Sequence, residues 1–259
     1  MRRVLLSACL MGITLLAGAQ YKLAPPLLRY SSVFFAKEAT LQMEFAQPGC
    51  EVRFTMNNSV PNQTSDIYKK PITVKSNITV TARAFGKGFE PSEAVQVQFW
   101  QAGHAYTANN ITIPNNRYAS KGKASLNDNK GGFVNHGSGT WLGYDADSVV
   151  FDIGIAAGKP AQSLMLHCLQ HQGAWIFLPQ RIKTYALNSD GTTGSLMANN
   201  ELAVGKDDKT IVVPLSISLS KAQSAGALRI VIFPVKTLPA WHAGATQHAW
   251  FFIDELKLY

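Results

Sequence analysis

The chain has 259 residues, of which 46% are hydrophobic and 15% are charged. This length is enough for one large domain or two ordinary ones. The basic residues form no run longer than Lys69-Lys70, which excludes a continuous nucleic-acid-binding stripe. The formal net charge is +8, and Arg2 and Arg3 contribute two of these charges, so about +6 remains without them. This charge favours either anionic glycans or envelope lipids as partners, or simply a surface with scattered lysines, which we prefer.

Residues 1–19 have the pattern of an export signal. The basic pair Arg2-Arg3 precedes a short apolar run, and Ala17-Gly18-Ala19 has the small-residue pattern of a cleavage site. The apolar run is too short for a transmembrane span. We therefore expect a periplasmic, cell-surface or secreted protein without a membrane span. Lipoprotein processing at Cys9 ranks second, because it leaves almost no apolar segment before the cysteine.

Removal of this signal would leave two cysteines, Cys50 and Cys168. Oxidising compartments permit a disulfide, but the two residues lie in separate predicted domains. Cys168 also lies within an apolar run, residues 164–169. We therefore predict two unpaired, buried thiols.

Short alternating segments dominate the sequence, and long helical patterns are absent after the N-terminus, which predicts an all-β protein. In the first part of the chain, apolar and polar residues alternate in the segments 41–45, 52–55, 78–84 and 95–99. A period of two places one set of side chains against a core and the other in water. About seven short strands in this length suggest an immunoglobulin-like sandwich over residues 25–100.

The amino-acid sequence of this first part resembles a known family. Residues 49–61, GCEVRFTMNNSVP, resemble the G-x-x-I-x-Y-T-x-D-G-S-x-P stretch of the chitobiase/β-hexosaminidase C-terminal domain. Residues 67–72 and 81–92 are similar to its following motifs. Asn57-Asn58 stand where that family usually has Asp-Gly, and asparagine tolerates the positive φ of such a turn. The resemblance implies a small non-catalytic spacer domain.

Residues 101–110 are polar, contain Gly and Ala, and show no apolar alternation, so we predict a linker there. The strand pattern then resumes over residues 111–259. Its predicted strands are residues 149–153, 164–169, 181–187, 215–219, 228–233 and 250–258. About eight strands over this length fit a jelly-roll sandwich.

The second part also resembles a known family. Residues 126–132 and 141–144 are similar to the opening of discoidin-like domains, the galactose-binding-like superfamily. Residues 173–179 and 241–255 resemble a subgroup that follows bacterial family 20 β-hexosaminidases. In those enzymes the order is hydrolase, hexosaminidase C-terminal sandwich and discoidin-like domain. The chain resembles that tail without its catalytic barrel.

A sugar site needs an aromatic platform beside side chains that donate and accept hydrogen bonds. Trp241 and His242, on a loop between Pro239 and Gly244, are the best candidates. Trp175, His136 and Asn135 complete the predicted ligand-binding set. The alternative for Trp175 is a loop anchor turned toward the core, and we leave both interpretations open. Trp250 lies within the terminal strand and is assigned to the core.

The discoidin-like resemblance also implies a structural calcium ion. The matching positions are the carbonyl of Leu126 and the carboxylates of Asp128 and Glu255. Oxygen ligands of this kind suit a hard cation. Asn129 replaces the usual glycine after Asp128. In the alternative, Asp128 caps a turn and Glu255 pairs with a lysine.

Other chemistry has little support in the sequence. His167, Cys168 and His171 lie close together, but no fourth zinc ligand has a matching spacing. A glycosidase needs two carboxylates across a cleft, and here the acidic residues lie on small sandwich frames, so we predict no catalytic residue.

We therefore expect an exported, non-catalytic protein that binds galactose- or N-acetylhexosamine-containing glycans through its second domain, with the first domain as a spacer. The alternative is a structural module that docks on a separate glycoside hydrolase or on the cell envelope, with Trp175 and Trp241 buried at a junction. A cryptic hydrolase ranks third.

Overall fold

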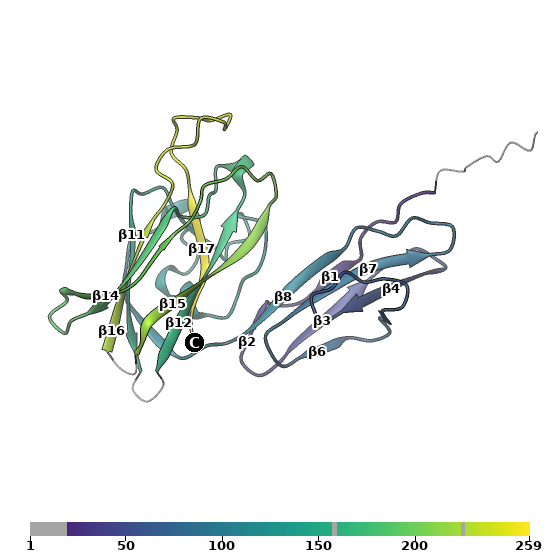
Figure 1. Cartoon of the computed structure of the whole chain (residues 1–259), viewed down its shortest axis with the longest axis horizontal. Helices are drawn as coiled ribbons and strands as arrows, with labels where there is room; N and C mark the ends of the chain where they lie inside the picture. The colour runs from purple at the N-terminus through teal and green to yellow at the C-terminus, as the bar shows by residue number, and fades with distance from the viewer. Residues whose placement is uncertain (1–19, 157–159, 224–225) are drawn as a thin grey trace, which may run out of the picture.

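The computed structural model describes residues 20–156, 160–223 and 226–259. The predicted export signal, residues 1–19, lies outside this part of the chain. Two β-sandwiches follow one another (Figure 1), so the predicted all-β fold is confirmed. Among the described residues, no helix has the length and apolar character needed to cross a membrane.

The first sandwich packs two sheets around one apolar core. One sheet has the strand order β1-β3-β6 and the other the order β2-β8-β7-β4-β5. The strands are β1 (Leu27–Arg29), β2 (Phe34–Phe35), β3 (Ala39–Glu44), β4 (Cys50–Thr55), β5 (Asp66–Ile67), β6 (Ile72–Val74), β7 (Ile78–Gly86) and β8 (Val95–Gln101). The predicted alternation holds, because Leu41, Val52 and Val80 point into the core. Asn58 adopts a φ of 66°, as expected for its turn.

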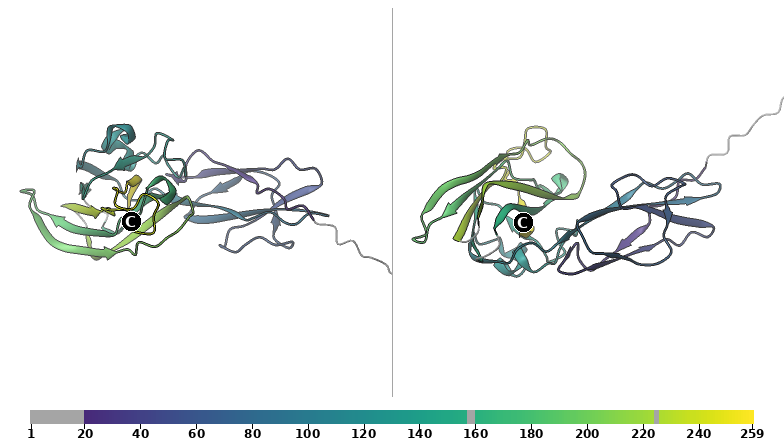
Figure 2. Two further views of the ribbon diagram at one scale, coloured as in Figure 1. Left: turned by 90° about the horizontal axis from the view of Figure 1, so that it is seen from above. Right: turned by 60° about the horizontal axis from the view of Figure 1, so that its bottom comes forward.

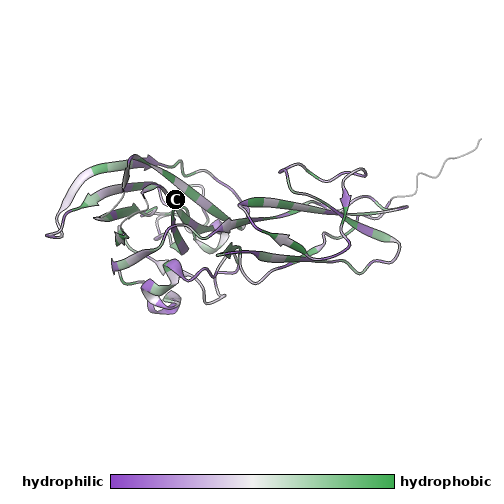
Figure 3. Ribbon diagram, turned by 90° about the horizontal axis from the view of Figure 1, so that it is seen from below, coloured by the Kyte–Doolittle hydropathy of each residue, from purple (hydrophilic) through white to green (hydrophobic). Residues whose placement is uncertain are grey.

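The second sandwich has sheets of order β10-β17-β12-β15 and β14-β13-β16-β11-β9. Its strands are β9 (Tyr106–Ile111), β10 (Leu142–Tyr144), β11 (Val149–Ile155), β12 (Ala161–Gln170), β13 (Arg181–Leu187), β14 (Thr193–Glu201), β15 (Ile211–Gln223), β16 (Gly226–Phe233) and β17 (Phe251–Leu258). Three short 3₁₀ helices lie in the described loops: η1 (Asn116–Tyr118), η2 (Gly122–Asn127) and η3 (Gln172–Ala174). In Figure 3 apolar and polar residues alternate along many of the strands.

The predicted linker, residues 101–110, is wrong over most of its length. Strand β8 ends at Gln101 and strand β9 begins at Tyr106, so only residues 102–105 lie between strands. Strand β9 is an edge strand, and within the described chain its one neighbour in the sheet is β11. Because water covers much of one side of it, it tolerates Asn109 and Asn110 and shows no apolar alternation.

The two sandwiches lie end to end (Figure 2) and share buried contacts. The ring of Phe34 meets His167 edge-on, with 4.8 Å between the ring centroids. Met165, on β12, belongs to the core cluster of the first sandwich. The amide of His104 donates to the carbonyl of Leu258 at 2.7 Å, which ties the connecting segment to the end of β17. The core of the first sandwich therefore extends across the junction to β12.

Both cysteines of the described chain are free, as predicted. Cys168 is fully buried, and burial raises the pKa of its thiol. Cys50 is only partly buried, so the expectation that both thiols are buried is wrong for Cys50. It is the first residue of β4 and pairs with Gly86, the last residue of β7.

Gly132 is a sensitive position of the junction. An added Cβ there would lie 2.6 Å from two methyl carbons of Val33, and its φ is +89°. We predict that Gly132→Ala lowers the free energy of unfolding by about 1 to 3 kcal/mol more than Gly191→Ala does. Gly191 is the matched control, because its φ is +81° and its Cβ would meet nothing within 4 Å. Urea unfolding of both variants checks this, and equal losses would contradict it.

Candidate functional site

Two of the predicted sugar-binding residues are tryptophans that remain open to solvent. Trp175 is 38% exposed and Trp241 is 41% exposed. Trp175 follows η3, and Trp241 lies on the loop between β16 and β17, drawn in yellow at the top of the second sandwich in Figure 1. Neither side chain lies among the contacts of the domain junction. The structure therefore leaves both available to a ligand.

Trp175 is held in an unusual backbone conformation. Its φ is 66° and its ψ is 14°, the left-handed region. Bulky residues rarely adopt this region, which costs roughly 1 to 2 kcal/mol. Its amide donates to the carbonyl of Gln172 at 2.8 Å, and its own carbonyl accepts from the amide of Trp250 at 2.8 Å. These two bonds fix the turn that presents the indole.

His242 organises the loop of Trp241. Its Nδ1 accepts from the amide of Gly244 at 3.0 Å, so its Nε2 carries the proton and donates to the carbonyl of Gln172 at 2.9 Å. Gly244 also packs against the indole of Trp175, where an added Cβ would lie 2.9 Å from the ring. Both nitrogens of His242 are thus engaged within the protein. We assign it to holding the two tryptophan loops together.

A pocket of about 290 Å³ lies near η3, since its lining residue His136 contacts His171. Its lining residues are Arg117, Tyr118, Ser120, His136, Gly137, Gly139 and Trp141. The predicted residue His136 faces this pocket, and its ring lies 5.8 Å from His171. The side chain of the neighbouring Asn135 accepts from the amide of Gly137 at 2.9 Å. Asn135 therefore shapes the loop, and His136 lines the pocket.

The two groups of residues are adjacent. The ring of Tyr118 meets Trp250 edge-on at 5.4 Å, and the amide of Trp250 bonds to the carbonyl of Trp175. The guanidinium of Arg117 lies 5.4 Å from the ring centre of Tyr118. Arg117 and Tyr118 were not predicted from the sequence, because they stand in a polar loop outside the motifs that carry the resemblance. Trp250 is half-buried against Phe252, consistent with its assignment to the core.

The predicted calcium ligands have other partners in the structure. The carbonyl of Leu126 accepts from the hydroxyl of Tyr106 at 2.7 Å. Asp128 accepts from the amide of Lys130 at 3.0 Å and pairs with Lys121 at 3.1 Å. These contacts match the alternative prediction for Asp128, in which it caps a turn instead of binding calcium.

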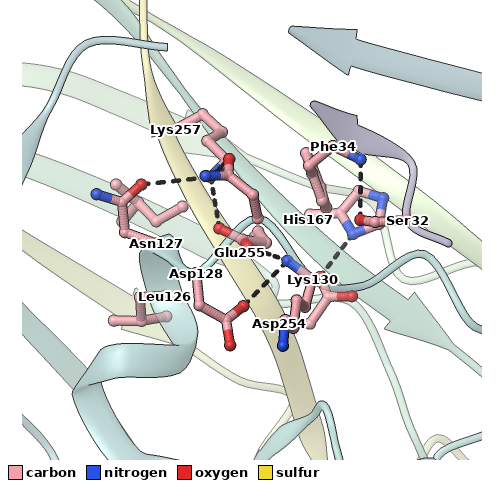
Figure 4. Close-up of polar contacts among 12 residues, drawn as sticks. Ser32, Phe34, Leu126, Asn127, Asp128, Lys130, His167, Asp254, Glu255 and Lys257 are labelled. Carbon is pink, nitrogen blue, oxygen red and sulfur yellow. Dashed lines mark hydrogen bonds and ion pairs between the residues drawn. The ribbon is translucent and has the colours of Figure 1, made fainter. Parts of the chain in front are cut away.

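Glu255, the third of these residues, is fully buried and lies 2.7 Å from the ammonium of Lys257 (Figure 4). Burial raises the pKa of Glu255 to about 8, and the charge of Lys257 acts in the opposite direction. In the part of the chain that the structure describes, no group of three His, Cys, Asp or Glu side chains is placed to hold a metal ion.

The three residues considered for zinc point in different directions. His167 Nδ1 bonds to the carboxylate of Asp254 at 2.6 Å (Figure 4), and Cys168 lies in the main core. His171 instead stands beside His136. Successive residues of a strand face opposite sides, so His167 and Cys168 do not converge on a common point.

Comparison with known proteins identifies the first segment. Residues 31–97 match the family model of the chitobiase/beta-hexosaminidase C-terminal domain, which confirms the resemblance of that part of the chain. A search of curated proteins found no match.

Similar solved structures include three bacterial domains. The family 32 carbohydrate-binding module of Streptococcus pneumoniae EndoD has 15% identity and a TM-score of 0.37, covering 60% of this chain and 96% of that chain. The family 32 module of C. perfringens NanJ, in complex with galactose, has 14% identity and a TM-score of 0.36, covering 59% and 92%. The C-terminal domain of a chitobiase from Bacteroides fragilis has 13% identity and a TM-score of 0.36, covering 60% and 92%.

We predict that His242→Ala loosens the Trp241 loop without unfolding the protein. Each hydrogen bond that is lost contributes about 1 kcal/mol. Hydrogen exchange should therefore accelerate at the amides of residues 241–247 and near Gln172. His248→Ala is the control, because His248 is an exposed histidine of the same loop. Unchanged exchange in the His242 variant would contradict the role assigned to this ring.

Proposed function

We propose that this chain is a carbohydrate-binding protein and that the sugar binds at the loop end of the second sandwich. One observation carries the proposal: two solvent-open tryptophans lie on loops that pack together at Gly244, and Trp250 connects Trp175 to a pocket lined by Arg117, Tyr118 and His136. A pyranose has an apolar face and a rim of hydroxyls. Indole rings match the face, while guanidinium and imidazole groups bond to the rim.

The conformation of Trp175 supports this assignment. A tryptophan in the left-handed region costs free energy that a smaller or more flexible residue would avoid. The fold retains this conformation and leaves the indole 38% exposed, although an apolar ring gains more from burial. Such an arrangement suits a preformed platform, since a platform that is already in place loses little entropy when a ligand binds.

We assign no catalysis to the site. Hydrolysis of a glycosidic bond ordinarily requires two carboxylates on opposite sides of the sugar. The lining of the pocket among the described residues includes neither Asp nor Glu. The ligands that we propose are galactose- or N-acetylhexosamine-containing glycans, met outside the cytoplasm after export. The first sandwich then serves as the spacer that carries the binding domain.

The affinity for a single sugar should be weak. Sugar hydroxyls exchange hydrogen bonds with water for hydrogen bonds with protein at little net gain. Exposed tryptophans are also typical centres of protein interfaces, so a docking surface for a separate glycoside hydrolase or for the cell envelope is the competing assignment. The two assignments predict different results when the indoles are removed. The first predicts loss of sugar binding, and the second predicts loss of binding to a hydrolase or to the envelope.

A glycan array on residues 20–259 tests the proposal, followed by titration calorimetry with the best sugar. We predict that Trp241→Ala and Trp175→Ala each lower the affinity at least about tenfold, because stacking on an indole contributes roughly 1 to 3 kcal/mol. Leu196→Ala is the control, because Leu196 is a 51% exposed apolar residue on the distant strand β14.

Binding that survives both tryptophan substitutions would overturn the location of the site. A blank array from folded protein would overturn the sugar assignment and favour the docking surface.

A further inference from the structure

Lys257 is a buried lysine on the last strand, and its ammonium lies inside a cage of oxygens. The residue is only 1% exposed. Its Nζ lies 2.7 Å from Oε2 of Glu255, 2.9 Å from Oδ1 of Asn129 and 3.3 Å from Oδ1 of Asn127. Figure 4 shows two of these residues converging on the ammonium. Asn127 comes from residues 127–130, here called the opening loop, and Glu255 comes from strand β17. The ammonium donates hydrogen bonds to the two asparagine oxygens, and Glu255 forms an ion pair with it.

The backbone of the opening loop is shaped for this contact. Asn129 has a φ of 57°, the left-handed region that asparagine enters more readily than other side chains. Glycine would satisfy the same backbone but would offer no side-chain oxygen. The asparagine therefore does two things at once, because it makes the turn and directs an amide oxygen to Lys257.

The cage is closed by the first sandwich. The ammonium lies 5.1 Å from the centre of the Phe34 ring, a cation–π contact made across the domain junction. A buried charge needs a partner of opposite charge and further hydrogen bonds. The carboxyl group of Glu255 lies 2.7 Å from the ammonium, the two asparagines accept its hydrogen bonds, and the ring of Phe34 covers it.

The residues of this cage do not fit a calcium ion in addition to the ammonium of Lys257. Calcium takes six to eight oxygens at about 2.3 to 2.6 Å. The oxygens of Glu255 and of the opening loop are instead directed at a resident positive charge, and the carbonyl of Leu126 already accepts from Tyr106. A second cation in the same cage would meet the ammonium at close range in a poorly hydrated environment, where like charges repel strongly.

We propose that the ammonium of Lys257 takes the place of a calcium ion and fastens residues 127–130 to strand β17. The second sandwich then closes its opening loop with a cation from its own chain. This inference rests on the contacts of the cage and is independent of the ligand that the distant tryptophans bind.

The first test measures the melting temperature of residues 20–259 in excess calcium chloride and in excess chelator. We predict the same temperature in both. A metal site filled a hundredfold above its dissociation constant would raise the melting temperature by roughly 5 to 10 °C. A saturable rise of this kind in the unaltered chain, with calcium uptake by calorimetry, would overturn the proposal.

The second test removes the ammonium. Lys257→Met should lower the melting temperature by roughly 6 to 20 °C, because it leaves Glu255 buried without its partner. Asn129→Gly is a milder variant that keeps the positive φ and removes one oxygen, and it should lower the melting temperature by roughly 2 to 4 °C. Lys123→Met is the control, because Lys123 is exposed on η2 in the same region.

Wild-type stability in both cage variants would overturn the role of the ammonium. If Lys257→Met fails to fold, the milder variant and the calcium measurement on the unaltered chain still decide the question.

Discussion

Burial of charge on strand β17 is the constraint on which the second sandwich depends. Every residue of β17 is buried, and three of them, Asp254, Glu255 and Lys257, have ionisable side chains. Charges removed from water must find partners, or the folded state loses several kcal/mol for each of them. Asp254 takes His167 and the amide of Gly132 as partners. The opening loop and the first sandwich thus pack where the charges of β17 require them.

The same strand also orders the candidate sugar site. Trp250 immediately precedes β17 and bonds through its backbone to Trp175, while its ring meets Tyr118. Both the tryptophan loops and the pocket are therefore attached to one end of a strand that cannot move without disturbing the core. A site supported in this way presents its side chains in nearly fixed positions. Exposed indoles on such a frame lose little freedom when a flat sugar face meets them.

Sequence analysis predicted the architecture well because alternation reports burial directly. Strands such as β4, β7 and β16 were recognised by a period of two, which only one buried face produces. The edge strand β9 was missed for the same reason, since its side chains lie partly in water and its pattern resembles a linker. Contacts between distant segments were beyond such patterns. The oxygen atoms around Lys257, for example, come from residues 127, 129 and 255.

The candidate site was predicted in composition but not in the roles of its members. Tryptophan and histidine in a loop indicate sugar chemistry, and the structure brings Trp175, Trp241 and His136 to one end of the domain. Whether a histidine ring nitrogen is free to bind a ligand depends on the backbone groups around it. No sequence motif specifies those groups. His242 has the residue type of a ligand-binding group, yet two backbone groups occupy its ring. Side-chain type alone cannot distinguish these cases.

An internal ammonium and a bound metal ion solve the same physical problem in different ways. Both supply positive charge to oxygens that the fold has gathered and that would otherwise be buried without partners. A metal contributes stability only in proportion to its free concentration, through mass action. A lysine is always present, although its side chain loses rotamer freedom on burial. The lysine also determines which groups can form the cage. Its aliphatic stem must lie along β17, and its ammonium must pair with Glu255, which then does not serve as a metal ligand. A sandwich closed in this way has an opening loop whose order depends on residues of the same chain, and the loops at the other end of the sandwich are connected to it through β17.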